Sequence, residues 1–341
     1  ELPALIKAGY STFKLFMTYD DLKLDDGQIL RLLALARQHG ALALVHAENT
    51  ECISWLTRNL VGAGLVAPRY HALSRPALVE REATHRAMTL AELVDVPILL
   101  VHVSSREAVE QIRWGRARGL KILAETCPQY LLLTAADLGI DDSYEGARCV
   151  CSPPPRDRAS QQAIWDGLGD GLFTVLSSDH APFNFEDPHG KKPNGEEVDF
   201  PHIPNGIPGI ETRLPLLYSE GVLGGRITLN RFVELTATNP AKAYGLHPRK
   251  GTIAIGSDAD LVIWGNEPIT LTNATLHHAA DYTPYEGMRL KAWPVCTLSR
   301  GHVVWDGRRF LGRAGHGRFL PRGLPTLLPA SSSSFSDGNP S

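Results

Sequence analysis

Short apolar runs alternate with segments of helical periodicity over the first 249 residues of the chain. Apolar side chains at three- and four-residue spacing indicate amphipathic helices, and continuous apolar runs of four or five residues are typical of buried strands. The pattern predicts helices over residues 2–8, 26–39 and 80–94 and strands over residues 13–17, 41–45, 97–101, 121–124, 148–151 and 173–176. Ser104 and Glu107, at capping-box spacing, predict one more helix start. Such alternation predicts parallel pairing and an α/β fold.

The pattern changes near residue 250. Short apolar runs are then separated by tight turns such as Arg300-Gly301 and Asp306-Gly307, and residues 294–310 are expected to form a hairpin. We therefore divide the chain into an α/β domain over residues 1–249, a small β module over residues 250–322 and a disordered tail over residues 323–341, which is rich in serine.

Composition narrows the possible partners. The chain has 341 residues, of which 43% are hydrophobic and 21% charged, and a formal net charge of -3. A balance this close to neutral gives no electrostatic reason to expect nucleic acid or an anionic membrane as partner. No apolar run approaches the ~20 residues of a membrane span. The five cysteines are odd in number and dispersed, which favours reduced thiols and a cytoplasmic protein over a disulfide framework.

Four of the apolar runs contain or precede a residue that could bind a metal ion. Lys14 lies within the first, His46 ends the second, His102 ends the third, and Asp179 follows the fourth. In a (β/α)8 barrel the carboxyl ends of the strands open onto one face, so these side chains would converge there. Two neutral imidazoles, a carboxylate and a lysine that has reacted with carbon dioxide to form a carbamate are a good ligand set for zinc or a similar divalent ion.

Each residue also has a purely structural interpretation. A buried lysine such as Lys14 can form an ion pair, a histidine at a strand end is more often a hydrogen-bonded core residue, and Asp179 could cap a helix. Agreement among four separate strands favours the site. His180, beside Asp179, could support it. The remaining histidines are expected to be structural or at the surface: His39, His71, His85, His189, His202, His247, His277, His278, His302 and His316.

Ordered motifs cover nearly the whole chain up to about residue 322. They are FKLFMTY (13–19), VHAEN (45–49), HALSRP (71–76), VHVSS (101–105), ETCPQYL (125–131), CSPP (151–154), SDHAPF (178–183), NGIPGIE (205–211), NPAK (239–242), KGTI (250–253) and GSDADL (256–261). With these motifs the sequence resembles the cyclic amidohydrolases of the dihydropyrimidinase and D-hydantoinase group, within the amidohydrolase superfamily. The resemblance implies a TIM barrel of the metal-dependent hydrolase type with a small β-sandwich module.

The resemblance also implies roles for individual residues. Lys14 would be carbamylated and bridge two Zn²⁺ ions, with His46 and His102 on one ion and Asp179 on the other. Asp179 would also take the proton from the bridging hydroxide and deliver it to the leaving nitrogen, and Tyr19 would donate to the oxyanion. The ring amide of the substrate would be bound through main-chain groups of two further residues, Ser152 and Asn205. From the residues alone, packing of Tyr19 is the simpler interpretation.

The chain departs from the family pattern in one respect. The family has a His-x-His pair on its first barrel strand, and the sequence contains none. We therefore expect an N-terminally truncated copy with about five of eight barrel strands, the C-terminal part of the β module, one metal site mostly present and the other incomplete. Such a chain is expected to be weakly active or inactive.

The expected reaction is hydrolysis of a cyclic amide, a dihydropyrimidine or 5-substituted hydantoin, to an N-carbamoyl amino acid. Allantoinase or dihydroorotase activity is the alternative within the class, and a non-catalytic scaffold related to dihydropyrimidinase is the alternative outside it. All four candidate metal ligands are present, which argues against a non-catalytic scaffold. The third alternative is a plain structural α/β domain. The resemblance implies a homotetramer.

Overall fold

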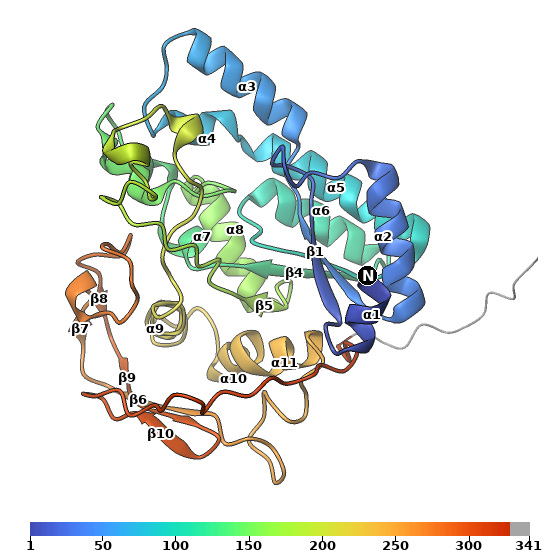
Figure 1. The fold of residues 1–341 in the computed structure, drawn as a ribbon, viewed down its shortest axis with the longest axis vertical. Helices are drawn as coiled ribbons and strands as arrows, with labels where there is room; N and C mark the ends of the chain where they lie inside the picture. Colours follow the sequence, from blue (N-terminus) through green and yellow to red (C-terminus); the bar gives the residue numbers. More distant parts are fainter. Residues whose placement is uncertain (328–341) are drawn as a thin grey trace, which may run out of the picture.

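Five parallel strands form the central sheet of the computed structural model, which describes residues 1–327 (Figure 1). The strands pair in sequence order, from β1 to β5, so each connection is a crossover that contains at least one helix. This arrangement confirms the predicted parallel α/β organisation and the predicted five strands. Their bounds are β1 Thr12–Phe16, β2 Leu42–His46, β3 Ile98–Leu100, β4 Ile122–Thr126 and β5 Val175–Leu176.

The three helices predicted with bounds are confirmed as α1, α2 and α5, whose ends lie within three residues of the predicted positions. The α-helices are α1 Leu2–Lys7, α2 Asp26–His39, α3 Thr50–Gly62, α4 Tyr70–Ser74, α5 Ala77–Val94, α6 Arg106–Ala117, α7 Gln129–Leu132, α8 Arg158–Gly169, α9 Arg213–Leu217, α10 Leu229–Val233 and α11 Asn239–Ala243. Local chemistry fixes their ends. Asp25 accepts a hydrogen bond from the Gln28 main chain at 2.7 Å in a capping box, and Gly40 ends α2 in the left-handed conformation.

The two faces of the sheet differ in what covers them. Leu15, Val45 and Leu100 point to the main core, beneath α2, α5, α6 and α8, which line one side of the sheet (Figure 1). The alternate residues of the same strands point to the opposite face, where Leu42 and Leu99 form a smaller apolar cluster. Polar side chains lie on that inner face at the carboxyl ends of β2 and β4 and, at Lys14, in the middle of β1, and this is where the candidate site lies.

A second core joins the loops above the sheet to the later part of the chain. Tyr282, Tyr285 and Leu290 are buried together with Phe185 and Phe200. Residues 269–290, including the two-stranded pair β7 Ile269–Thr270 and β8 Arg289–Leu290, therefore share a core with segments from the α/β part. The predicted domain boundary at residue 250 stays a prediction.

The β module contains a three-stranded antiparallel sheet in the order β10-β9-β6. Its strands are β6 Leu261–Gly265, β9 Trp293–Ser299 and β10 His302–Trp305. Arg300 and Gly301 both have positive φ, 48° and 78°, which is the conformation of a two-residue hairpin turn. The predicted hairpin at Arg300-Gly301 is thus confirmed, whereas residues 251–260 form turns rather than strands.

Two local expectations were wrong. Residues 148–151 form no strand. The helical turn η2 Tyr144–Cys149 occupies the first half of the segment, and the Val150 carbonyl accepts hydrogen bonds from Gly206 and from the Lys191 side chain instead of a neighbouring strand. Helix α6 is capped by Ser105, whose hydroxyl accepts from the Ala108 main chain at 3.2 Å. Ser104 is bound to a buried glutamate and is not the cap.

The start of the predicted tail is anchored to the opposite end of the chain. The Arg322 main chain donates to the Gly9 carbonyl at 3.0 Å, and the Ser11 hydroxyl donates to the Gly323 carbonyl at 2.7 Å. Figure 1 shows this last described segment ending beside α1. The remainder of the predicted tail, residues 328–341, lies outside the described residues.

Two further sequence expectations concern cysteines and membranes. All five cysteines are free thiols, and Cys127, Cys149 and Cys151 are buried. Across residues 1–327, none of the helices combines the length and the apolar character needed to cross a lipid bilayer.

The central strand β3 should dominate the stability of the sheet. Ile98 is 0% exposed, so Ile98→Ala should lower the free energy of unfolding by about 2–5 kcal/mol through lost burial and a residual cavity. Ile140→Ala removes the same atoms from a side chain that is 84% exposed, and it should change the free energy of unfolding by less than about 0.5 kcal/mol. Urea titration followed by circular dichroism measures both, and equal effects would contradict this account of the core.

Candidate active site

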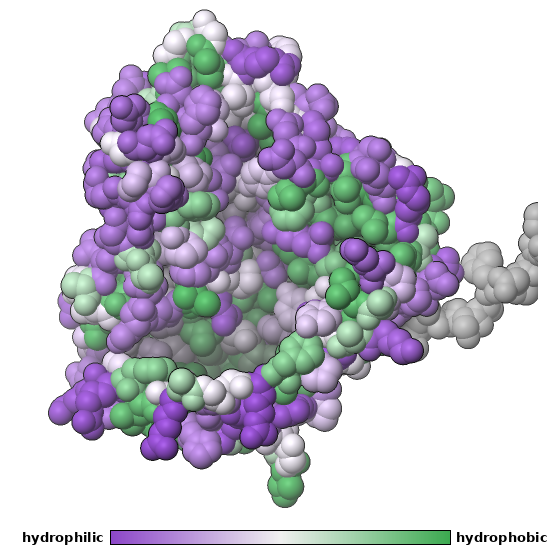
Figure 2. All heavy atoms as spheres, in the orientation of Figure 1, coloured by the Kyte–Doolittle hydropathy of each residue, from purple (hydrophilic) through white to green (hydrophobic). Residues whose placement is uncertain are grey.

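The four predicted metal-binding residues lie along one edge of the sheet. Lys14 is in β1, His46 is the last residue of β2, His102 follows β3 by two residues and Asp179 follows β5 by three. Phe16 pairs with His46 in the parallel register, and Val45 pairs with Leu100, so the ends of β1, β2 and β3 are level. The face seen in Figure 2 is hollowed near its centre.

The two histidines form the closest pair of the site. The ring centroids of His46 and His102 are 4.4 Å apart, in an edge-to-face arrangement. His102 is 3% exposed, and neither of its ring nitrogens has a hydrogen-bond partner among the described residues. Burial lowers the pKa of His102 well below its usual value, and His46 and Lys14 lower it further. A metal ion binds a neutral imidazole through the ring nitrogen that carries no proton, and the unpaired nitrogens of His102 leave such a nitrogen available.

Asp179 lies within electrostatic reach of the same groups. Burial raises the pKa of its carboxyl group, whereas Lys14 and His46 act to lower it. Asp179, His102 and Tyr19 all have positive φ, at 45°, 42° and 69°. Such a conformation costs free energy in residues other than glycine and is concentrated at functional sites. The three residues follow the ends of three different strands, so three backbone positions with positive φ lie at this edge.

The expected burial of Lys14 was wrong. The Lys14 side chain is exposed, although its neighbours Leu15 and Met17 are buried. Among the described residues β1 pairs only with β2, so the inner face beside Lys14 has a neighbouring strand on one side. The amine lies 4.8 Å from the centre of the Phe16 ring.

Tyr19 packs against the histidine pair. Its ring lies edge-on to the His46 ring, with centroids 5.3 Å apart. Burial, followed by the negative charge of Glu48, raises the pKa of the Tyr19 phenol, while Ser152 and Arg75 act in the opposite direction. The phenol therefore remains protonated at neutral pH and can donate a hydrogen bond.

Sequence reasoning missed Glu48, which is fully buried beside His46. Its Oε2 atom lies 2.7 Å from His46 Nε2 and accepts from the Ser152 hydroxyl at 2.6 Å. Burial opposes ionisation of Glu48, but the bond to His46, the charge of Arg75 and the bond to Ser152 together lower its pKa to about 2. Arg75 Nε in turn donates to the Ser152 hydroxyl at 3.1 Å. The VHAEN motif contains Glu48, but only the tertiary structure brings Ser152 to it.

Glu125 is a second missed carboxylate. It lies in β4 between the strand ends that carry His102 and Asp179, is 6% exposed, and accepts a 3.3 Å hydrogen bond from the Tyr244 hydroxyl. Burial raises its pKa, and the negative charge of Asp179 adds to the shift. The strand-end rule that selected the other candidates would have found Glu125 as well.

The 205–211 loop is bound to the residues that follow Asp179. His180 Nδ1 accepts hydrogen bonds from the Gly209 and Ile210 main chains at 3.0 and 3.3 Å. At the start of the loop, the side-chain oxygen of Asn205 is buried and has no partner within residues 1–327. Asn205 is therefore an available polar group, and His180 holds the loop that carries it.

A buried ion pair supports the segment after His102. Glu80 accepts from the Ser104 main chain at 2.8 Å and from the Ser104 hydroxyl at 2.7 Å, and Arg156 lies 3.1 Å from the same carboxylate. Arg156 also donates to the Arg75 carbonyl. This network joins α5, the loop after β3 and the segment after Ser152, and it fixes their positions relative to one another.

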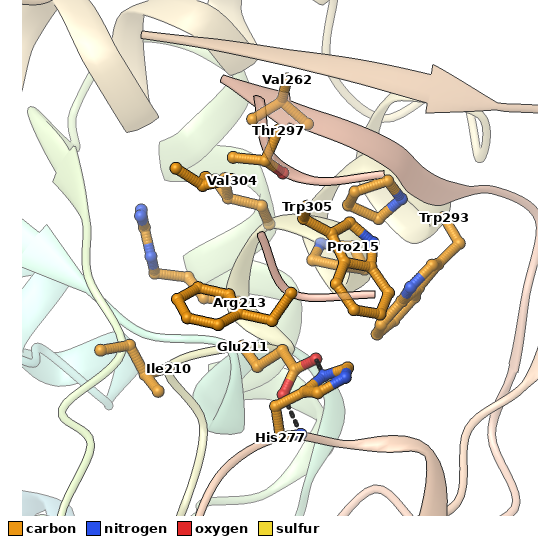
Figure 3. A pocket seen from close by; sticks show the side chains of 13 residues that line it. Ile210, Glu211, Arg213, Pro215, Val262, His277, Trp293, Thr297, Val304 and Trp305 are labelled. Atoms are coloured by element: carbon orange, nitrogen blue, oxygen red, sulfur yellow. Dashed lines mark hydrogen bonds and ion pairs between the residues drawn. The ribbon is translucent and has the colours of Figure 1, made fainter. Parts of the chain in front are cut away.

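A separate pocket of about 650 Å³ lies between α9 and the small β sheet (Figure 3). Trp293 and Trp305 line it, and Glu211 Oε1 lies 2.8 Å from His277 Nδ1 at its edge. None of the predicted site residues lines this pocket. Glu211 ends the 205–211 loop, so the ion pair connects that loop to the later part of the chain.

Comparisons with known proteins agree with this geometry. The amidohydrolase family model matches residues 5–304. D-hydantoinases from Rhizobium radiobacter and Ralstonia pickettii are each 45% identical over 324 residues, which is 94% of this chain and 70% of theirs. A D-hydantoinase crystal structure aligns with a TM-score of 0.91 and 44% identity, over 95% of this chain and 70% of that one. For an L-hydantoinase (dihydropyrimidinase) from Arthrobacter aurescens, the TM-score is 0.84 and the identity 31%, over 94% of this chain and 70% of that one.

The chain therefore belongs to the amidohydrolase family. The similarity to hydantoinase structures confirms the predicted fold class, the hydrolase type of (β/α)8 barrel, and the predicted family resemblance.

The residues present partly fit the metal centre that the family implies. Within residues 1–327, no three His, Cys, Asp or Glu side chains are arranged to hold a metal ion. His46 and His102 provide two imidazoles, and a third ligand would have to come from Lys14. An ammonium group has no acceptor atom, so Lys14 could bind a metal only after conversion to a carbamate.

The buried ion pair behind the site should be essential for stability. Glu80→Gln removes the charge that compensates Arg156 and should lower the free energy of unfolding by about 3–5 kcal/mol. Glu82→Gln, in the same helix, breaks a half-exposed pair with Arg86 and should cost no more than about 1 kcal/mol. Urea unfolding measures both changes. A loss in Glu80→Gln no larger than in Glu82→Gln would show that the network does not stabilise this edge.

Proposed function

We propose that the chain is a divalent-metal-dependent hydrolase of cyclic amides, which opens a dihydropyrimidine or 5-substituted hydantoin to an N-carbamoyl amino acid. The observation that carries the proposal is the unpaired, buried imidazole of His102 beside His46, at a strand edge shared with Lys14 and Asp179. The 45% identity to relatives named D-hydantoinase supports the substrate class.

The metal proposed is zinc. The family arrangement has two ions, and in this chain the second site lacks its His-x-His pair. His46, His102 and a carbamylated Lys14 would hold one ion, and Asp179 would contribute to the other. A bound divalent ion would polarise the ring carbonyl and lower the pKa of a water molecule. The unpaired nitrogens of His102 and the exposed amine of Lys14, which carbon dioxide can reach, are consistent with this assignment.

The chain's own residues would supply the proton transfers and the orientation of the substrate. Water adds its oxygen to the ring carbonyl carbon, the ring C–N bond breaks, and the nitrogen gains a proton. Asp179 would accept the proton from the attacking water and pass it to the leaving nitrogen. The protonated phenol of Tyr19 would donate to the carbonyl oxygen as negative charge develops on it. The main-chain groups of Ser152 and Asn205 would hold the ring amide.

The relatives also suggest a stereochemical preference. The curated relatives at 45% identity are named D-hydantoinase, whereas the L-hydantoinase structure is 31% identical. We therefore propose that the D enantiomer of a 5-substituted hydantoin is the better substrate. A homotetrameric assembly and a cytoplasmic location are further parts of this proposal.

The first test is ring opening by the zinc-supplemented chain, with the N-carbamoyl product measured by chromatography. We expect turnover of dihydrouracil and of D-5-phenylhydantoin at a low rate, because the chain lacks the His-x-His pair of the second metal site. Lys14→Ala should abolish turnover, and Asp179→Asn should reduce it by about 10²–10⁴-fold because a proton-transfer group is lost. Lys7→Ala, an exposed lysine at the end of α1, is the matched control and should retain full activity.

Other outcomes separate the alternatives. Turnover of allantoin or dihydroorotate in place of both expected substrates would support the other members of the class. A chain that binds no zinc and turns over none of the four compounds, yet assembles, would support the non-catalytic scaffold.

A further inference from the structure

Lys191 is a lysine that the proposed mechanism does not use. It is 0% exposed, and its amine donates to two main-chain carbonyls, those of Val150 at 2.7 Å and Pro204 at 2.6 Å. The titratable groups that act on it most strongly, besides burial itself, are the Cys149 and Cys151 thiols and not carboxylates. A buried ammonium without a carboxylate is costly, so such an arrangement needs a reason beyond packing.

The two carbonyls belong to segments that are distant in sequence and adjacent in space. Val150 precedes Ser152 by two residues, and Pro204 directly precedes Asn205. The Gly206 main chain donates to the same Val150 carbonyl at 3.1 Å, so the amine reinforces an existing contact. Without a donor at this point, two buried carbonyl groups would lose hydrogen bonds and the segments could separate.

The backbone of Lys191 is itself held in place. Its main-chain N–H donates to the Asn184 carbonyl at 2.7 Å, and its carbonyl accepts from the Tyr144 hydroxyl at 2.5 Å. Gly190 is required beside it, because a Cβ atom there would lie 2.0 Å from the Asn184 carbonyl oxygen. The amine is thus delivered from a fixed point, as positioning requires.

We propose that Lys191 is a positioning residue that ties residues 150–152 to residues 204–206 and thereby sets the spacing of the two main-chain sites that bind the substrate ring. The proposal rests on the function proposed above, in which Ser152 and Asn205 hold the ring amide. It assigns Lys191 no contact with the substrate.

The adjacent lysine provides a matched control. Lys192 binds the exposed carboxylate of Glu186 at 2.9 Å and touches neither segment. Burial lowers the pKa of Lys191 to about 7, so its amine carries a fractional charge at neutral pH. Methionine at position 191 would fill a similar volume without donating a hydrogen bond.

The test compares Lys191→Met with Lys192→Met in the full chain, by hydantoin turnover and by amide hydrogen exchange. In Lys191→Met we expect KM to rise at least 10-fold while kcat falls less than 3-fold, because binding of the ring is weakened in the ground state and transition state alike. Exchange should accelerate in residues 150–152 and at the amides of Asn205 and Gly206, and it should stay unchanged in β3. Lys192→Met should match the parent in every respect.

Other results would overturn the proposal. Unchanged amide exchange of both segments in Lys191→Met would overturn the proposal even if the parent chain hydrolysed none of the substrates. Failure of the positioning role is therefore distinguishable from failure of the proposed function. Loss of thermal stability with parental KM would show a purely structural role. If Lys191→Met does not fold, Tyr144→Phe removes one support of the Lys191 backbone and should raise KM in the same direction by a smaller factor, whereas an unchanged KM would contradict the proposal.

Discussion

Parallel pairing of the strands is the constraint on which the rest of the molecule depends. Because each strand runs in the same direction as its neighbour, the carboxyl ends of all five lie at one edge, and residues that are more than a hundred positions apart become neighbours. The level register of β2 and β3 brings His46 beside His102. Further from that edge, Leu42, Leu99 and Leu123 make an apolar cluster on the same inner face.

Buried charged groups near this edge are stabilised by hydrogen bonds and ion pairs. Glu48 is ionised with two partners on one oxygen, Glu80 is paired with Arg156, and the Lys191 amine has two carbonyls. Each arrangement would destabilise the fold if one partner were removed. Glu80 lies in α5, and the other groups come from the loops above the sheet. These loops are held together by polar contacts as well as by the second apolar core.

The sequence predicted the architecture better than the surroundings of each side chain. The apolar runs identified all five sheet strands, and their polar ends identified His46 and His102, because both signals are local. The strand over residues 148–151 was wrongly predicted, since the bonding of Val150 depends on a lysine 41 positions away. Exposure of Lys14 depends on which strands flank β1. The importance of Glu48 depends on contacts with Ser152, 104 positions away.

Hydrogen bonds between residues 9–12 and residues 322–323 affect how the chain folds. Arg322 donates to the Gly9 carbonyl and to the Thr12 hydroxyl, and Ser11 donates to the Gly323 carbonyl, across 310 or more positions. On a ribosome, the segment leading into the strand that carries Lys14 is made about 310 residues before these partners. Contacts of such large sequence separation form late and slow folding. During synthesis, the segment leading into β1 therefore lacks these partners until residue 323 has emerged.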